Sequence, residues 1–163
     1  MSNSILVVYA TRAGSTVEVA QAIAETLATR GFKVDVKPAK GKPEVEGYKA
    51  VMIGSGIRMG NWLPEAIAFV KKNQQVLNQV PVALFTVHML NSGEDEESVA
   101  NRLAYLNSVH PLITPVDEVF FTGKMDLSRL SIIDRLIAKT VKAVDEDKRD
   151  WDLIRDWALH VEI

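Results

Sequence analysis

The chain has 163 residues, of which 47% are hydrophobic, so it is long enough to bury the core of one domain, which we expect over residues 1–163. A formal net charge of −2 gives no support for nucleic-acid binding, and the absence of cysteine excludes disulfides, iron–sulfur ligation and cysteine-based zinc sites. The histidines, His88, His110 and His160, lack the spacing of metal ligands, so no metal site is predicted.

The chain begins with a predicted strand and helix. Residues 5–9 are an apolar run, Ile-Leu-Val-Val-Tyr, which is typical of a buried strand. From Val17 the apolar residues recur every three or four positions, which predicts a helix face. That helix should end near Gly31, because glycine suits the left-handed conformation that closes many helices.

The loop between this strand and helix carries small polar residues. The first backbone N–H groups of a helix have no partner within it and attract anions. The hydroxyls of Thr11, Ser15 and Thr16 add donors, and Gly14 allows a close approach of the backbone. The loop is therefore either a phosphate-binding cradle or an ordinary loop whose hydroxyls cap the helix.

Downstream, short apolar runs alternate with stretches of helical periodicity. Residues 32–36 alternate apolar and polar side chains, as expected for a strand at a sheet edge, whereas the apolar runs at 50–54 and 80–85 indicate central strands. The other predicted elements are a glycine-rich loop over 54–62, a helix from Pro64, a loop over 86–95, a helix marked by Val99, Leu103 and Leu106, a strand over 116–122 and a closing helix from Trp151.

Strands that alternate with helices predict an α/β fold, in which a five-stranded parallel sheet carries helices on both faces. Right-handed crossovers and a phosphate site after the first strand favour the strand order 2-1-3-4-5. Ligands of such sheets bind at the carboxyl ends of strands one, three and four. The sequence places its glycines and hydroxyls in the loops that follow these strands.

The first loop resembles that of the flavodoxins. Tyr9, Thr11, Gly14, Thr16 and Ala20 stand in the register of the flavodoxin signature, and the loop lacks the Gly-Lys-Ser/Thr of a triphosphate-binding loop. The resemblance implies a flavodoxin-like three-layer sandwich. It also implies flavin mononucleotide (FMN) as the cofactor, with its phosphate in this loop.

By the same resemblance, the loops after strands three and four hold the flavin ring. Gly56 and Gly60 are candidates to let a peptide reorient toward flavin N5, since glycine tolerates positive φ. Trp62 either stacks on the ring or anchors the following helix, and Met59 either stacks or fills space. The residues expected to bind the cofactor are Thr11, Arg12, Ala13, Gly14, Ser15, Thr16, Ser55, Gly56, Ile57, Arg58, Met59, Gly60, Asn61, Trp62, Thr86, Val87, His88, Met89 and Leu90.

Two of these residues are also catalytic candidates. Electron-carrier flavodoxins surround the ring with acidic residues, whereas the flavin-side loops here carry Arg12 and Arg58. A cation near N1 and O2 would stabilise a reduced, anionic flavin, which suits electron uptake from a substrate. Alternatively, Arg58 is a solvated loop residue. His88 is either a general base or a contact residue.

An additional segment at about 124–144 precedes the closing helix. Its apolar residues follow helical spacing and its basic residues outnumber its acidic ones, so we expect an inserted amphipathic helix. Such a helix either lies on an anionic membrane or a partner, or packs on the flank of the domain.

Three further stretches indicate a closer relationship. The run Ile53–Gly60, the run Ile133–Ile137 and Asp150–Trp151 resemble the flavodoxin-like, quinone-dependent protoporphyrinogen IX dehydrogenases. This resemblance implies an FMN oxidoreductase that passes electrons from a reduced tetrapyrrole or similar small molecule to a quinone. The alternatives are a flavodoxin that carries single electrons between proteins, and a scaffold that has lost FMN.

The sequence also limits partners and location. The N-terminus lacks the pattern of a signal peptide and no stretch is long enough to span a bilayer, so we expect a cytoplasmic protein. The basic segment leaves open a peripheral position at the inner face of the membrane. A homodimer is also left open.

Overall fold

The computed structural model describes residues 3–12, 14–89, 93–125, 146–147 and 149–163. Its main sheet has the strand order β2-β1-β3-β5-β6, and all four pairings along this path are parallel. The short strand β4 adds an antiparallel pairing to β3, so the sheet has six strands. The predicted order of the five parallel strands is confirmed. The strands are β1 (Ser4–Ala10), β2 (Lys33–Pro38), β3 (Ala50–Arg58), β4 (Asn61–Trp62), β5 (Val82–His88) and β6 (Asp117–Thr122).

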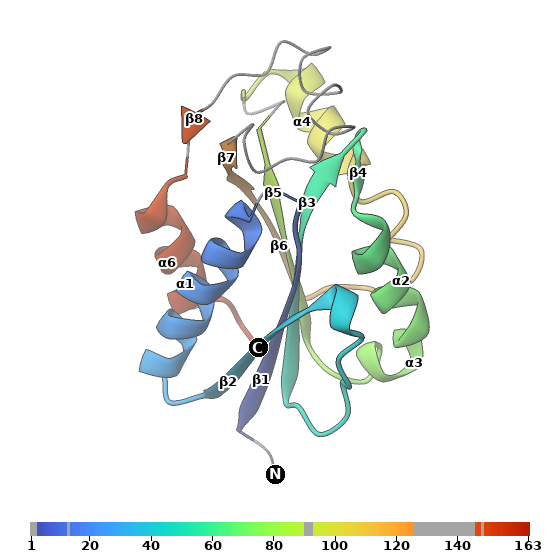
Figure 1. Cartoon of the computed structure of the whole chain (residues 1–163), viewed down its shortest axis with the longest axis vertical. Helices are drawn as coiled ribbons and strands as arrows, with labels where there is room; N and C mark the ends of the chain where they lie inside the picture. Colours follow the sequence, from blue (N-terminus) through green and yellow to red (C-terminus); the bar gives the residue numbers. More distant parts are fainter. Residues whose placement is uncertain (1–2, 13, 90–92, 126–145, 148) are drawn as a thin grey trace.

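Helices cover both faces of this sheet, as Figure 1 shows. One layer contains α1 and α6, and the other contains α2 and α3. The three-layer arrangement expected from the sequence is therefore confirmed. The helical elements are α1 (Ser15–Thr29), η1 (Ala39–Gly41), α2 (Pro64–Lys72), α3 (Gln74–Leu77), α4 (Glu96–Ala104) and α6 (Trp151–His160).

The core lies on both sides of the central strands. Successive side chains of β1 point to opposite faces, so Leu6 and Val8 pack toward α2 while Ile5 and Val7 pack toward α1 and α6. All four side chains are fully buried. This double burial explains why the sequence of β1 is apolar throughout.

Two strands are longer than the sequence suggests. Strand β3 continues to Arg58 and turns back into β4, so residues 54–62 form a hairpin and not an irregular loop. Strand β5 continues to His88, so Thr86, Val87 and His88 end a strand and do not belong to a loop. In both cases the strand is extended by pairing with its neighbours in the sheet. The hydrophobic pattern along a single strand does not predict such pairing.

The helix predicted from Val99, Leu103 and Leu106 is present as α4, although it is shorter than that spacing suggests. In α4 no residue is buried, and Leu103 is 49% exposed. Leu106 is buried but follows the end of the helix. The predicted helix is therefore confirmed at Val99 and Leu103, but it ends before Leu106 and buries none of its residues.

The inserted helix predicted at about 124–144 lies outside the described residues, apart from its first positions. There, Lys124 and Met125 form β7 (Lys124–Met125), which pairs antiparallel with β8 (Glu146–Asp147). The register Lys124↔Asp147 therefore places the start of the segment beside residues that follow its predicted end.

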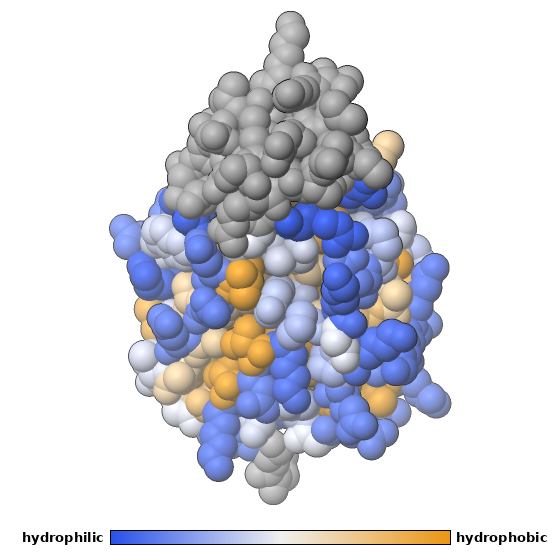
Figure 2. Space-filling model, in the orientation of Figure 1, coloured by the Kyte–Doolittle hydropathy of each residue, from blue (hydrophilic) through white to orange (hydrophobic). Residues whose placement is uncertain are grey.

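On the face drawn in Figure 2, the described surface is mostly hydrophilic, with apolar residues gathered beside α1. The edge strand β2 exposes Lys33 and Lys37, and such charges discourage pairing with another strand. Among the described helices, none combines the length and apolar character needed to cross a bilayer.

Candidate functional site

The first loop ends at an uncapped helix N-terminus. Gly14 precedes α1 in the left-handed conformation (φ 87°), and no side chain caps this helix. The N–H of Gly14 donates to Thr11 Oγ1 (2.9 Å), which holds the loop closed. Ser15 and Thr16 therefore do not cap α1, so the capping alternative is wrong. The first amides of the helix remain available for an anion.

The hydroxyls of Ser15 and Thr16 lie where three chain segments meet. Thr16 is 1% exposed, and a Cβ placed on Gly56 would lie 3.4 Å from its Oγ1. A Cβ placed on Gly123 would lie 3.5 Å from Ser15 Oγ and 2.7 Å from a methyl group of Val87. The glycines at the ends of β3 and β6 thus leave room beside these hydroxyls.

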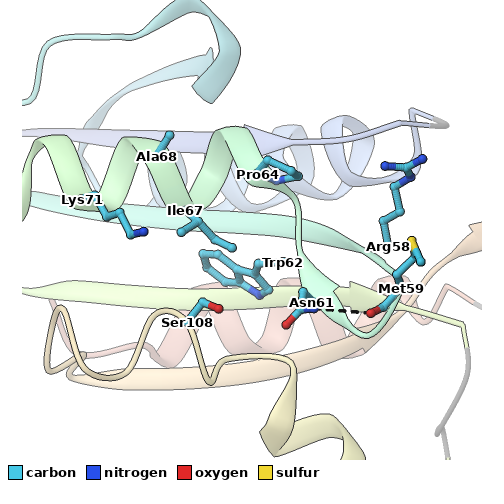
Figure 3. Close-up of a pocket in the computed structure, with 9 residues that line it drawn as sticks. All are labelled: Arg58, Met59, Asn61, Trp62, Pro64, Ile67, Ala68, Lys71 and Ser108. Carbon is cyan, nitrogen blue, oxygen red and sulfur yellow. Dashed lines mark hydrogen bonds between the residues drawn. The ribbon is translucent and has the colours of Figure 1, made fainter.

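The β3–β4 hairpin turns at Met59 and Gly60. Both residues have positive φ, 54° and 77°, and Arg58 pairs with Asn61 across the turn. A two-residue hairpin loop with positive φ at both positions is a type I′ turn, for which asparagine or glycine is preferred. Met59 occupies this unfavourable conformation with its side chain 74% exposed (Figure 3). Of the two glycines proposed to reorient, only Gly60 has a positive φ.

Buried hydrogen bonds stabilise the base of this hairpin, and they involve Ser55, Trp62 and Thr86. Ser55 is fully buried, donates to the carbonyl of Gly56 (2.7 Å) and accepts from the N–H of Leu63 (3.0 Å). Trp62 is 1% exposed, and its Nε1 donates to Thr86 Oγ1 (2.9 Å). The indole therefore anchors the start of α2 to β5, which is the second of the two roles considered for Trp62.

His88 lies inside the protein and not on a loop. Its side chain is 5% exposed and stands between the rings of Tyr105 (6.0 Å between centroids) and Phe120 (6.1 Å). Its carbonyl accepts from the N–H of Gly123 (2.9 Å). An imidazole enclosed in this way packs the end of β5, so the proposed role as a general base is not supported by its position.

Arg12 is bound to the first turn of α2. Its guanidinium forms a two-pronged ion pair with Glu65, with Nη2 and Oε2 3.0 Å apart. Burial by itself would raise the pKa of Glu65, but hydrogen bonds from Arg12, with a further contribution from the charge of Lys40, hold that pKa below its usual value. This pair joins the first loop to α2.

Replacing Glu65 with glutamine should remove a stabilising contribution that depends on pH. Because the pKa of Glu65 is lower in the folded protein, its contribution is complete above the unfolded pKa and is lost as pH falls through the folded pKa. We expect wild type to exceed Glu65→Gln by about 1 kcal/mol near neutral pH and to lose this advantage in acid. Urea unfolding of both proteins between pH 7 and pH 3 measures the difference. A constant difference across this range would contradict the ion-pair explanation.

The structure leaves the other candidates in varied environments. Val87 is buried, while Ile57, Arg58 and Met89 are half-buried near the ends of β3 and β5. Ala13 and Leu90 lie outside the described residues. Within the described part of the chain, no group of three potential metal ligands is found.

Two features of the site are not predicted from sequence. Glu65 lies 53 positions from Arg12, and no local pattern connects them. Gly123 stands beside Ser15 only because the end of β6 lies next to the end of β5 in the sheet. A glycine directly after a predicted strand was the one signal that could have identified the second feature.

Comparison with known proteins gives a family and two named relatives. The model of the flavodoxin domain matches residues 6–152. A protoporphyrinogen IX dehydrogenase [quinone] from Escherichia coli (strain K12) is 27% identical over 158 residues, which span 93% of this chain and 87% of the relative. The protein of the same name from Leishmania major is 26% identical over 169 residues, spanning 96% and 71%.

Solved structures share the fold. Oxidised Flavodoxin 2 from Bacillus cereus matches with a TM-score of 0.61 and 19% identity, over 96% of this chain and 95% of that one. A flavodoxin mutant from Fusobacterium nucleatum bound to flavin mononucleotide matches with a TM-score of 0.56 and 14% identity, over 94% and 92%. At these identities the similarity concerns the arrangement of the chain alone.

Proposed function

This chain belongs to the flavodoxin domain family, and on that premise we propose that it binds FMN and acts as an FMN-dependent oxidoreductase. The observation that carries the proposal is the first loop. There the uncapped start of α1, the hydroxyls of Ser15 and Thr16 and the space left by Gly56 lie together. No lysine of a triphosphate-binding loop is present, so a single phosphate group suits the loop better.

The donors fit a phosphate dianion. The N-terminus of a helix carries a partial positive charge of roughly half a unit, and α1 is a helix of 15 residues. Backbone N–H groups of its first turn and the two hydroxyls would donate to the phosphate oxygens. Thr11 has a structural role, because its Oγ1 accepts a hydrogen bond from the N–H of Gly14 and so stabilises the conformation of the loop.

The β3–β4 hairpin and the end of β5 would orient the flavin ring. When bound, FMN supplies the ability to accept and release electrons at its ring system. Gly60 offers a backbone position that tolerates positive φ, and Arg58 places a half-buried cation on the same hairpin. A cation there would favour reduction of a bound flavin. Trp62, held by Thr86, would keep the hairpin in position.

For the substrate we propose a reduced tetrapyrrole such as protoporphyrinogen, with a quinone as electron acceptor. The support is the printed name of the relatives at 26% and 27% identity. Arg58 on the β3–β4 hairpin also favours electron uptake from a substrate over a carrier that docks by negative charge. Arg12 adds less to this argument, because its charge is paired with Glu65.

The test is a visible absorption spectrum of the protein with FMN, followed by anaerobic stepwise reduction and an assay with protoporphyrinogen and a soluble quinone. We expect a bound-flavin spectrum, reduction mainly in two-electron steps, and turnover that requires both FMN and the quinone. Stable one-electron reduction without turnover would favour the carrier. A protein that does not bind FMN would overturn both redox functions.

A further inference from the structure

An ion pair joins the first turn of α1 to the segment that follows β8. Nη1 of Arg149 donates to Oε2 of Glu18, although the two residues are 131 positions apart in the sequence. The side chain of Arg149 is only 7% exposed, whereas that of Glu18 is 42% exposed. Arg149 also lies over the ring of Trp151, with its Cζ 4.6 Å from the ring centroid. The guanidinium is therefore held in place by two contacts.

This ion pair lies beside the loop assigned to the phosphate. Side chains three positions apart on a helix are neighbours, with Cβ atoms about 5–6 Å apart, and they point toward the N-terminus of the helix. Glu18 is therefore a neighbour of Ser15. Gly123, which leaves room beside Ser15 Oγ, directly precedes β7, and β8 pairs with β7 shortly before Arg149. Figure 1 shows β7 and β8 beyond the start of α1.

A carboxylate at this position opposes the binding of a phosphate. The start of α1 attracts anions through its first amides, but the charge of Glu18 in the same turn repels a second anion over a short distance. Arg149 cancels this charge at close range. Because the guanidinium is almost completely buried, water and salt weaken its effect less than they weaken that of an exposed cation.

We propose that Arg149 is a positioning residue of the phosphate site and that it acts through Glu18. The ion pair holds and neutralises the Glu18 carboxylate, so that a phosphate dianion binds at the start of α1 without an opposing charge beside it. The inference rests on the proposed binding of FMN and deepens it. It assigns to the phosphate site a residue from the segment between β8 and α6, far along the chain from the first loop.

The quantity to measure is the ratio of the affinities for FMN and riboflavin, because only FMN carries the phosphate. Flavin fluorescence gives both affinities for the full-length protein at low ionic strength. Arg149→Met removes the charge and keeps an apolar chain over Trp151. We expect it to lower the ratio at least about fivefold through weaker FMN binding, with riboflavin binding unchanged. The loss should shrink as salt is added, since salt screens charges.

Arg155→Met is the matched control for the loss of an arginine. Arg155 also lies over the ring of Trp151, 5.8 Å from the centroid, and the change removes the same charge. It leaves the pair of Arg149 with Glu18 intact, so the ratio should stay at the wild-type value. Arg149→Lys keeps a cation at the position and should retain most of the preference for FMN.

Glu18→Gln tests the sign of the effect. Without the carboxylate, Arg149 leaves a net positive charge beside the phosphate, so the ratio should rise above that of the wild type. Glu25→Gln, at an exposed position of α1 roughly 10 Å farther along the helix, should not raise it. Combining Glu18→Gln with Arg149→Met removes both charges and should restore the wild-type ratio.

The outcomes separate this inference from the proposed function. A wild-type protein that binds neither flavin, or both equally well, overturns phosphate binding in the first loop and the inference with it. If the wild type prefers FMN, the role of Arg149 alone is overturned by an unchanged ratio in Arg149→Met, an equal loss in Arg155→Met, or no recovery in the double variant. Circular dichroism verifies the fold of each variant. If Arg149→Met does not fold, the comparison of Glu18→Gln with Glu25→Gln decides the result.

Discussion

Changing Ser15 to alanine and Thr16 to valine together should weaken FMN binding by about a hundredfold or more. The two hydroxyls lie next to the uncapped start of α1, and each would donate a hydrogen bond to a charged phosphate oxygen. Hydrogen bonds to charged groups contribute about 1.5–3 kcal/mol each, and every 1.4 kcal/mol changes a dissociation constant about tenfold. Titration of the protein into FMN, followed by flavin fluorescence, measures the affinity.

Riboflavin provides the control ligand, because it has the same ring system without the phosphate. The double variant should bind riboflavin as the wild type does, so its preference for FMN should largely disappear. Thr29→Val is the matched protein control, since it removes a hydroxyl that donates to the carbonyl of Thr26 at the far end of the same helix. Unchanged FMN affinity in the double variant would place the phosphate elsewhere. An equal loss for both flavins would mean that the hydroxyls act through the fold or the ring.

Replacing Gly54 with alanine should destabilise the protein by about 3 kcal/mol or more. Gly54 pairs with Phe85 across β3 and β5, and a Cβ at position 54 would lie 1.9 Å from Cε2 of the Phe85 ring. The ring is fully buried and packs against Trp157, with centroids 6.4 Å apart, so it has little room to move. Overpacking of this kind usually costs about 1–3 kcal/mol, and this contact is shorter than a small shift can relieve.

Urea unfolding followed by tryptophan fluorescence gives the free energy of unfolding. Gly41→Ala is the control, because a Cβ there meets only Pro38 Cγ at 3.6 Å, and the change should stay within about 0.5 kcal/mol. If Gly54→Ala does not fold, the same change can be made in a Phe85→Leu background, where the smaller side chain should recover part of the loss. Equal destabilisation by Gly54→Ala with and without Phe85 would contradict the steric explanation.

The first loop could be located from sequence, whereas the state of its side chains could not. The change from a strand pattern to a helix pattern at Thr11–Thr16, with Gly14 between, is visible along the chain. Whether Ser15 and Thr16 cap the helix depends on backbone angles, and the left-handed Gly14 decides that they do not. The partnership of Arg12 with Glu65 needs two distant segments to meet.

The structure differs from the predictions at the strand ends, and it also shows what a helical period leaves undecided. Thr86 and His88 look like loop residues because they are polar and follow an apolar run, but pairing with β3 and β6 extends the strand through them. Leu103 fits a helical period and is nevertheless 49% exposed, and no residue of α4 is buried. A period shows which side chains share a face and not what that face contacts.

By itself, the sequence determined the alternation of strands and helices, the parallel order of the sheet and the position of the small polar loop between β1 and α1. These features follow from interactions between residues close in the chain, namely hydrophobic periodicity, glycine conformation and the constraints on crossover connections. The tertiary structure decided the role of Trp62 as an anchor, the burial of His88, the tight contact of Gly54 with Phe85 and the ion pair of Arg149 with Glu18. Each of these depends on which distant side chains meet once the sheet is assembled, and that information does not reside in any single stretch of the chain.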